Sequence, residues 1–252
     1  MAITLTNADN ALKTYYLDAV SSQLDQYINP FYAAIQKTTN DVWGKEIRKL
    51  AISGVNGGIG AGTEDGSLPN AVGNDYVQLV STLKNLYGVI EISDKAIRAS
   101  ENNAGAFVSL LNTEMQSLIK SSAFNFGRML FGDGNGRLAA IRTMEEGVIS
   151  IDTPNNIVEG MMIEICDSEG IPVEGIGPRR VVSVNREEKT VKVSGETIDD
   201  QLIPTYSYLV MQGSYGKELT GLGAIFSTRQ NTIYGADKTS HAILNPFIYP
   251  LN

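Results

Sequence analysis

The single histidine and the single cysteine of this 252-residue chain limit the chemistry that it can perform. One His241 and one Cys166 cannot build a disulfide framework, a paired-thiolate zinc site or a two-histidine metal site. A Ser-His-Asp triad would need His241, but no nucleophile elbow accompanies it, so we interpret this residue as a surface or loop histidine. Cys166 lies in the apolar run MMIEIC, which favours a small buried side chain. We therefore predict no catalytic residues.

Two glycine-bearing segments have spacings that also occur in ligand-binding loops. The run Gly58–Gly62 has the spacing of a dinucleotide-binding loop, but TEDGSLP follows where the phosphate-binding helix should begin. The run Asp133–Gly136 has the spacing of calcium-loop ligands, but Met144 occupies the position of the bidentate glutamate. We interpret the second run as a turn, and we predict no metal and no cofactor for this chain.

A long amphipathic helix is predicted between Asn102 and Phe131. Its apolar residues recur in steps of three or four, which places them on one helix face: Phe107, Leu111, Met115, Leu118, Ile119, Ala123, Phe126 and Leu130. Asn102 or Asn103 can cap the first N–H groups, and Gly132 stands where a left-handed residue would end the last turn. At about 1.5 Å per residue the helix would span roughly 40 Å, enough to cross a whole subunit.

A helical arm and an extended hairpin are predicted before this helix. An amphipathic pattern within residues 1–40 is interrupted at Asn29-Pro30, which favours two helices joined by a bend. Residues 41–93 contain two strand patterns on either side of Gly54–Asp75, which holds seven glycines and a proline. A two-stranded ribbon is marginally stable by itself in water, so we expect it to lie on a neighbouring chain.

A small acidic β-barrel is predicted after the helix, within Glu145–Gly213. It contains five short strand patterns separated by turn signals: GVISI, GMMIEI, RRVVSV, KTVKVS and YSYLVM. The segment carries thirteen acidic and five basic residues, so it holds the whole net charge of −8 of the chain. Five-stranded barrels often bind nucleic acid, but a module of this charge would repel phosphates. Residues 214–252 follow with short apolar pieces and turns, and they supply no catalytic constellation.

The order of these elements and four runs of residues carry a resemblance to a known family. The runs are NDVWGKEIRKLAISGVNGGIGAGTEDGSLP (Asn40–Pro69), NLYGVIEISDKAIRASENNAGAF (Asn85–Phe107), FNFGRMLFGDGNGRLA (Phe124–Ala139) and KELTGLGAIF (Lys217–Phe226). Over nearly the whole chain the sequence resembles the major capsid proteins of tailed bacteriophages, which share the Hong Kong 97-type fold, in particular those of phages and prophages of Gram-positive bacteria.

The resemblance implies an α+β fold with five parts in chain order. Residues 1–40 would be the N-terminal helical arm and residues 41–93 the extended β-hairpin loop. Residues 94–144 would hold the spine helix, the peripheral domain and the start of the axial domain. Residues 145–213 would be a small barrel inserted in the axial domain, which continues over residues 214–252. Family members extend further, and the apolar ending FIYPLN favours a fragment of a longer chain.

The function implied by the resemblance is structural and not enzymatic. The chain would self-assemble as hexamers and pentamers into an icosahedral shell, or head, of a virion. The shell would enclose double-stranded DNA without sequence-specific binding. A scaffolding protein and a maturation protease are further candidate partners. Two alternatives stay open: an encapsulin-like nanocompartment with a protein cargo, and an enzyme with an accessory barrel. Without a signal peptide or a membrane-spanning run, we expect a soluble protein made inside the cell. The resemblance implies that this is the cytoplasm of the bacterial host.

Overall fold

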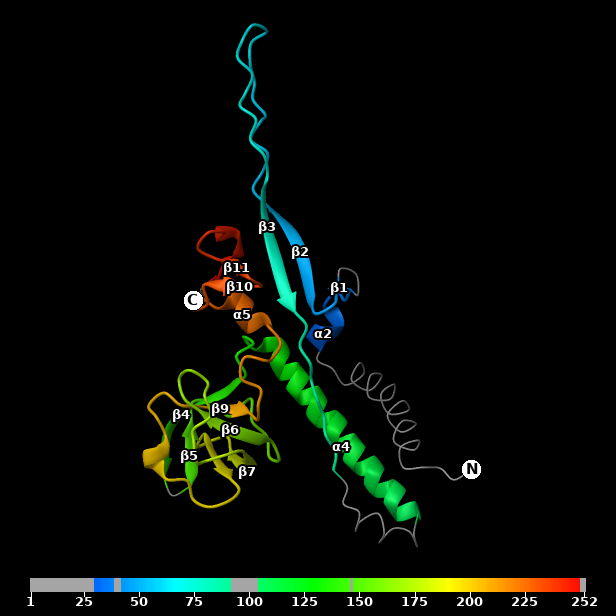
Figure 1. Ribbon diagram of the computed structural model, residues 1–252, viewed down its shortest axis with the longest axis vertical. Helices are drawn as coiled ribbons and strands as arrows, with labels where there is room; N and C mark the ends of the chain where they lie inside the picture. Colours follow the sequence, from blue (N-terminus) through cyan, green and yellow to red (C-terminus); the bar gives the residue numbers. More distant parts are fainter. Residues whose placement is uncertain (1–29, 39–41, 92–103, 146, 250–252) are drawn as a thin grey trace. The chain divides into compact units, whose positions relative to one another are not determined.

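The computed structural model describes residues 30–38, 42–91, 104–145 and 147–249, which form two compact units (Figure 1). One unit contains residues 1–37 and 85–131, and the other contains residues 38–84 and 132–252. The described elements mix helices with antiparallel sheets, and they include a long helix, a hairpin and a small closed barrel, in agreement with the predicted class.

The long helix α4 spans Ala104–Phe131, which confirms the predicted helix. Among the described side chains of the helix, Ile119 and Met129 are the buried apolar ones. The short helix α2, Pro30–Ala34, belongs to the same unit, and its Phe31 ring lies 5.4 Å from the Phe131 ring. The Tyr32 ring meets Phe126 edge-on at 5.1 Å. The predicted caps at Asn102 and Asn103, the side chains of Phe107 and Leu111, and the bend at Asn29 lie outside the described residues.

The predicted left-handed cap at Gly132 is wrong. The first glycine after α4 with a positive φ is Gly134, at 88°, followed by Gly136 at 83°. The helix therefore ends at Phe131, and the chain forms a turn over residues 132–136. Asp133 and Asn135 stabilise this turn, because their side-chain oxygens accept the backbone N–H groups of Asn135 and Arg137 at 3.1 and 2.8 Å.

The predicted hairpin is confirmed as an antiparallel sheet of order β1-β2-β3. Its strands are β1 (Val42–Trp43), β2 (Glu46–Ser53) and β3 (Asp75–Thr82). The pairing of β2 with β3 runs from Glu46 opposite Thr82 to Ser53 opposite Asp75. Both strands are shorter than predicted. Beyond Ser53 the chain forms the irregular segment 54–74, and beyond Thr82 no described residue up to Glu91 belongs to a strand.

The barrel has six strands in the closed order β4-β5-β8-β7-β6-β9, one more than predicted. The strands are β4 (Arg137–Glu145), β5 (Val148–Ile151), β6 (Met162–Cys166), β7 (Arg179–Asn185), β8 (Thr190–Val193) and β9 (Tyr208–Met211). Sequence reasoning missed β4 because two register shifts interrupt it, between Arg137 and Ala139 against β9 and between Ile141 and Thr143 against β5. Each bulge breaks the alternation that marks a strand.

The barrel contains the main core among the described residues. Nine of its apolar side chains are almost completely buried: Leu138, Ile149, Ile151, Ile157, Ile163, Val181, Val191, Leu209 and Val210. With β4 included, the segment 137–213 carries thirteen acidic and seven basic residues, a net charge of −6. Because closure pairs every strand on both sides, the barrel offers no free strand edge.

The chain segments directly before and after the barrel lie side by side. The Gly216 N–H donates a hydrogen bond to the Asn135 carbonyl oxygen at 2.9 Å. A Cβ atom placed on Gly136 would lie only 2.8 Å from the Ser214 carbonyl oxygen, so glycine is required for this approach. The barrel is therefore an insertion with adjacent ends.

Short elements follow the barrel: helix α5 (Leu222–Phe226), the hairpin of β10 (Thr232–Ile233) and β11 (Ala236–Asp237), and the 3₁₀ turn η2 (Ala242–Leu244). A second 3₁₀ turn, η1 (Asp200–Leu202), lies in the connection between β8 and β9. The Val80 N–H of β3 donates to the Tyr234 carbonyl oxygen at 2.7 Å, so the β10–β11 turn covers part of one edge of the long hairpin.

Candidate assembly surface

One face of the long hairpin exposes large apolar side chains. Leu50, Ile52 and Tyr76 are each more than half exposed, and Ile52 stands directly opposite Tyr76 in the ladder. Residues at alternate positions share a face, so these three side chains form one strip. Val77, on the other face, is buried. The usual arrangement of an apolar inner face and a polar outer face is therefore absent from this ribbon.

The tip, residues 54–74, extends the ribbon without a hydrogen-bonded ladder (Figure 1). Its two arms lie against each other, since Cβ atoms placed on Gly57 and Gly60 would lie 3.5 Å and 3.4 Å from side-chain atoms of Val72 and Pro69. The tip also exposes Val55, Ile59 and Leu68 at 85–90%. With the strip on the strands, these side chains form what we call the hairpin surface: Leu50, Ile52, Val55, Ile59, Leu68 and Tyr76.

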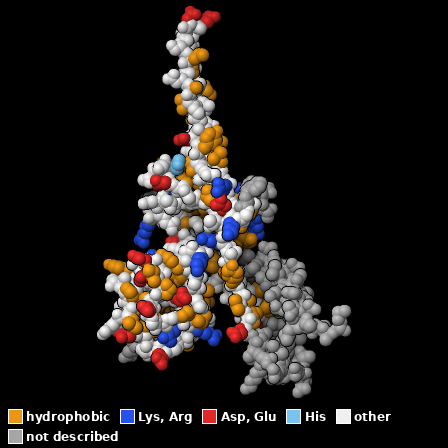
Figure 2. Space-filling view, viewed as in Figure 1, with side chains coloured by type: hydrophobic (Ala, Val, Ile, Leu, Met, Phe, Trp, Pro, Cys, Tyr) orange, Lys and Arg blue, Asp and Glu red, His pale blue; other side chains and the backbone are white. Residues whose placement is uncertain are grey.

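The tip ends in a turn over Thr63–Gly66, closed by a hydrogen bond from the Gly66 N–H to the Thr63 carbonyl oxygen at 3.0 Å. Glu64 and Asp65 are exposed in this turn, and Figure 2 shows acidic side chains at the end of the tip. They are the two charged residues of segment 54–74. The tip therefore presents a negative end, and the rest of segment 54–74 is uncharged.

Part of the β3 edge is also open. The Val80 N–H points away from β2, because it bonds to Tyr234. Alternate residues of a strand direct their backbone groups to the same side, so Gln78 and Tyr76 also point outward. No described residue is hydrogen-bonded to the outward backbone groups of these two residues. An open edge beside an exposed apolar strip is a surface on which a second chain can pair.

The structure places Cys166 in the barrel core, as the sequence predicts. The side chain is 1% exposed and packs with Tyr208 and Val210. Burial, reinforced by the negative charges of Glu164 and Asp167, raises the pKa of the Cys166 thiol to about 11. A thiol in this position is a packing group and not a nucleophile at neutral pH.

His241 lies in the loop before η2, where its backbone N–H donates to the Asp237 carbonyl oxygen at 3.1 Å. Hydrogen bonds from the Thr239 hydroxyl and N–H, with a smaller contribution from Ser240 and the charge of His241, hold the pKa of the Asp237 carboxyl below its usual range. The Asp237 carboxylate is thus engaged in its own turn. Among the described residues no group of three or more His, Cys, Asp or Glu side chains is placed to hold a metal ion.

The two glycine-bearing runs also have structural positions. Gly58–Gly62 lies in an arm of the tip, and the next regular element is strand β3. Asp133–Gly136 forms the predicted turn, in which the Asn135 side-chain amide donates to the Asp133 carboxylate at 2.7 Å. The carboxylate therefore satisfies local hydrogen bonds.

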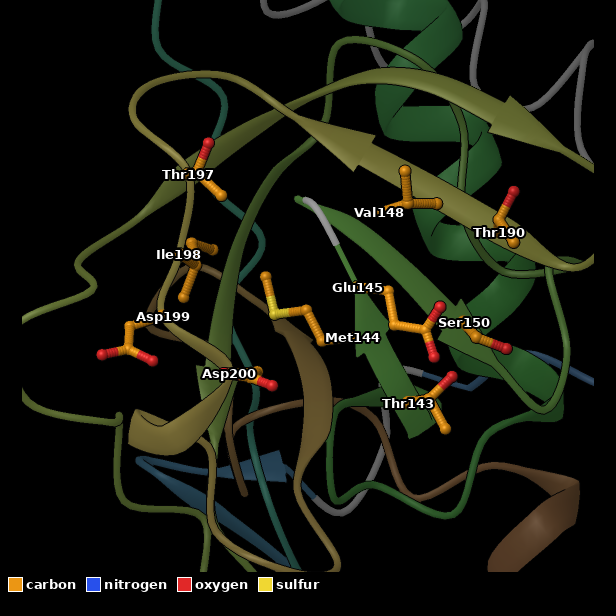
Figure 3. A pocket seen from close by; sticks show the side chains of 10 residues that line it. All are labelled: Thr143, Met144, Glu145, Val148, Ser150, Thr190, Thr197, Ile198, Asp199 and Asp200. Carbon is orange, nitrogen blue, oxygen red and sulfur yellow. The ribbon is translucent and has the colours of Figure 1, made fainter.

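Two adjoining clefts open at the barrel and were not predicted. The acidic cleft, of about 790 Å³, is shown in Figure 3 and is lined from β4, β5, β8 and the segment before η1. It includes Glu145, Asp199, Asp200 and four hydroxyl side chains, but no histidine, lysine or cysteine. The arginine cleft, of about 830 Å³, shares Glu145 and Asp200 with it and adds Arg137, Arg142 and Arg229.

No helix among the described residues has the length and apolar character needed to cross a membrane. No protein-family model, no curated protein and no solved structure matches this chain.

Proposed function

We propose that this chain is the major capsid protein of a tailed bacteriophage of the Hong Kong 97 type, which self-assembles into an icosahedral shell around double-stranded DNA. The observation that carries the proposal is the hairpin surface. The six large apolar side chains of this surface are each more than half exposed, and three of them are 85–90% exposed. A monomer that stays alone would expose this surface to water without compensation.

The free energy available from this surface is enough to drive association. Fully burying one large apolar side chain contributes about 1.5–3 kcal/mol. Covering half of the exposed area of six such side chains would therefore supply on the order of 5 kcal/mol before the entropy of association is subtracted. In a closed shell every copy both gives and receives this contact, so a modest gain per contact is multiplied over the whole assembly.

The other parts of the chain have compatible roles in the proposed shell. Helix α4 would be the spine of each subunit, and identical copies arranged as hexamers and pentamers would be the main partners. A scaffolding protein and a maturation protease would act during assembly in the host cytoplasm. The packaged DNA would meet the inner wall without sequence-specific contacts, and the chain would have no catalytic role.

The charge of the barrel favours one orientation in the shell. A module with a net charge of −6 would be repelled by packaged phosphates at every copy. On the outer wall the same charge would keep particles apart. We therefore expect the barrel on the outside, and a reconstruction with barrel density on the inner wall would contradict this orientation.

Electron microscopy of the purified full-length protein tests the proposed function. We expect closed shells of uniform diameter that contain nucleic acid when they are made in a phage-infected host. The double variant Ile59→Ser/Leu68→Ser should lose them, because it removes two exposed apolar anchors from the tip. The control Ile171→Ser/Val182→Ser changes two side chains of the barrel that are each 58% exposed, and it should retain the shells.

Two results would contradict the proposal. A wild-type protein that stays a discrete monomer at high concentration would exclude a shell-forming protein. Shells that carry a protein cargo and no nucleic acid, isolated from infected cells, would support a nanocompartment in place of a phage head.

A further inference from the structure

All the charged residues of the tip lie at its end. Glu64 and Asp65 are adjacent in the turn Thr63–Gly66, and no basic residue occurs in segment 54–74. Both side chains are exposed, and neither is among the residues that line the acidic cleft or the arginine cleft of the same chain. Each arm of about ten residues can carry the turn roughly 30 Å beyond the end of the β2–β3 ladder. The turn is therefore an exposed, negatively charged end that a cationic surface can bind.

The arginine cleft offers such a partner surface. Arg137 is held in place, with its guanidinium 3.9 Å over the Tyr208 ring and hydrogen-bonded to the Tyr208 hydroxyl at 3.0 Å. Arg142 and Arg229 are exposed, and among the described residues neither guanidinium group has a hydrogen-bond or ion-pair partner. The carboxylates of Glu145 and Asp200 also line this cleft, and they are shared with the acidic cleft. The three arginines exceed the two carboxylates.

Two backbone irregularities lie at this cleft. Arg142 is the residue at the register shift of β4 against β5, and a bulge of this kind redirects a side chain at the rim of a barrel. Tyr206 has a φ of 66°, which is unusual for a bulky residue, and its side chain is 82% exposed along the cleft. The volume of the arginine cleft, about 830 Å³, lies in the range that is usual for ligand-binding pockets.

Resting on the proposed function, we infer that the turn Thr63–Gly66 of one copy binds in the arginine cleft of another copy. The carboxylates of Glu64 and Asp65 would accept charge-assisted hydrogen bonds from Arg142 and Arg229. Such bonds are about twice as strong as neutral ones, and a guanidinium can bind a carboxylate through two parallel bonds. The apolar hairpin surface would supply most of the affinity, and the ion pairs would fix which part of the neighbour receives the tip.

Complementary charge reversals test this contact. Glu64→Lys/Asp65→Lys and Arg142→Glu/Arg229→Glu should each lower the yield of shells at least tenfold at low salt. The chain that carries all four changes should recover to within about threefold of the wild type, because the charges are complementary again. Glu187→Lys/Glu188→Lys, a second adjacent acidic pair in the β7–β8 turn, is the control and should not lower the yield.

Sedimentation below the concentration of shell formation separates this inference from the proposed function. Each charge reversal should abolish reversible self-association, and the chain that carries all four substitutions should restore it. This result would support the contact even if the wild type formed no shells. The inference would be overturned if both reversed variants formed shells as well as the wild type, or if the variant with all four substitutions gave no higher yield of shells than either reversed variant. The proposed function would still stand. A wild type with no self-association would overturn both.

Discussion

Replacing Gly170 with alanine should destabilise the barrel far more than the same change at Gly175. The two glycines have nearly the same positive φ, 87° and 84°. A Cβ atom at Gly170 would lie 2.0 Å from a ring carbon of Tyr215, whereas one at Gly175 would meet nothing within 4 Å. The pair therefore separates the cost of the backbone conformation from the cost of the steric overlap.

The expected magnitudes follow from these contacts. The left-handed backbone costs an L-residue about 1–2 kcal/mol, and both variants lose this amount. At Gly170 the Tyr215 ring must also move away from the Tyr208 ring, on which it stacks at a centroid distance of 6.1 Å. Loss of an aromatic pair costs about 0.5–1.5 kcal/mol, and partial exposure of the ring costs about 1 kcal/mol more. We expect Gly170→Ala to exceed Gly175→Ala by about 2 kcal/mol.

Native-state hydrogen exchange in the full chain measures these values. The amides of β6 and β9 report the free energy of barrel opening in increasing urea. The double variant Gly170→Ala/Tyr215→Ala provides a second check, because its cost should be smaller than the sum of the two single costs. Equal losses in Gly170→Ala and Gly175→Ala would show that the Tyr215 contact is not what requires glycine, and would refute the reasoning.

Three further predictions concern the helix, the thiol and the barrel. Ile119→Asp should remove the folded helix signal in circular dichroism, since a buried unpaired carboxylate costs several kcal/mol, whereas the exposed Ser117→Asp should keep it. Cys166, with a pKa of about 11, should be about one part in a thousand thiolate at pH 8. Iodoacetamide should therefore label it slowly in the native chain and quickly in urea, and equal rates would contradict its burial. Deletion of the residues between Asn135 and Gly216, which are already hydrogen-bonded, should leave a soluble chain with a protected α4, and an insoluble product would contradict an independent barrel.

Periodicity in the sequence was sufficient to predict α4 and the β2–β3 hairpin, but not which face of the hairpin is covered. Leu50 and Ile52 contribute to the apolar pattern that predicts β2, yet both side chains are exposed. Alternation shows which residues share a face, and the covering of that face depends on chains or segments elsewhere. The exposed strip was therefore not predictable from β2 and β3 alone.

The barrel shows where pattern reasoning fails for a physical reason. Strand β4 has two bulges, so its apolar residues do not alternate, and the predicted start of the barrel at Glu145 differs from the observed start at Arg137. A deletion made at the predicted boundary would leave the buried Leu138 without its partners. The arginine cleft could not be predicted from the sequence either, because Arg142 and Arg229 are far apart in the chain and only the folded unit brings them to one cleft.

The adjacent ends of the barrel affect how the chain can fold. Bringing Asn135 to Gly216 in an unfolded chain closes a loop of about 80 residues, at an entropic cost of about 4 kcal/mol. Burial of the apolar side chains in the barrel core offsets that entropic cost. Once the barrel has formed, the segments on either side of it, at Gly134 and Thr220, are already close together when the rest of the unit folds. We expect a barrel that forms early to act as a kinetic template, which shortens the effective distance between the two halves of the surrounding unit and speeds its folding.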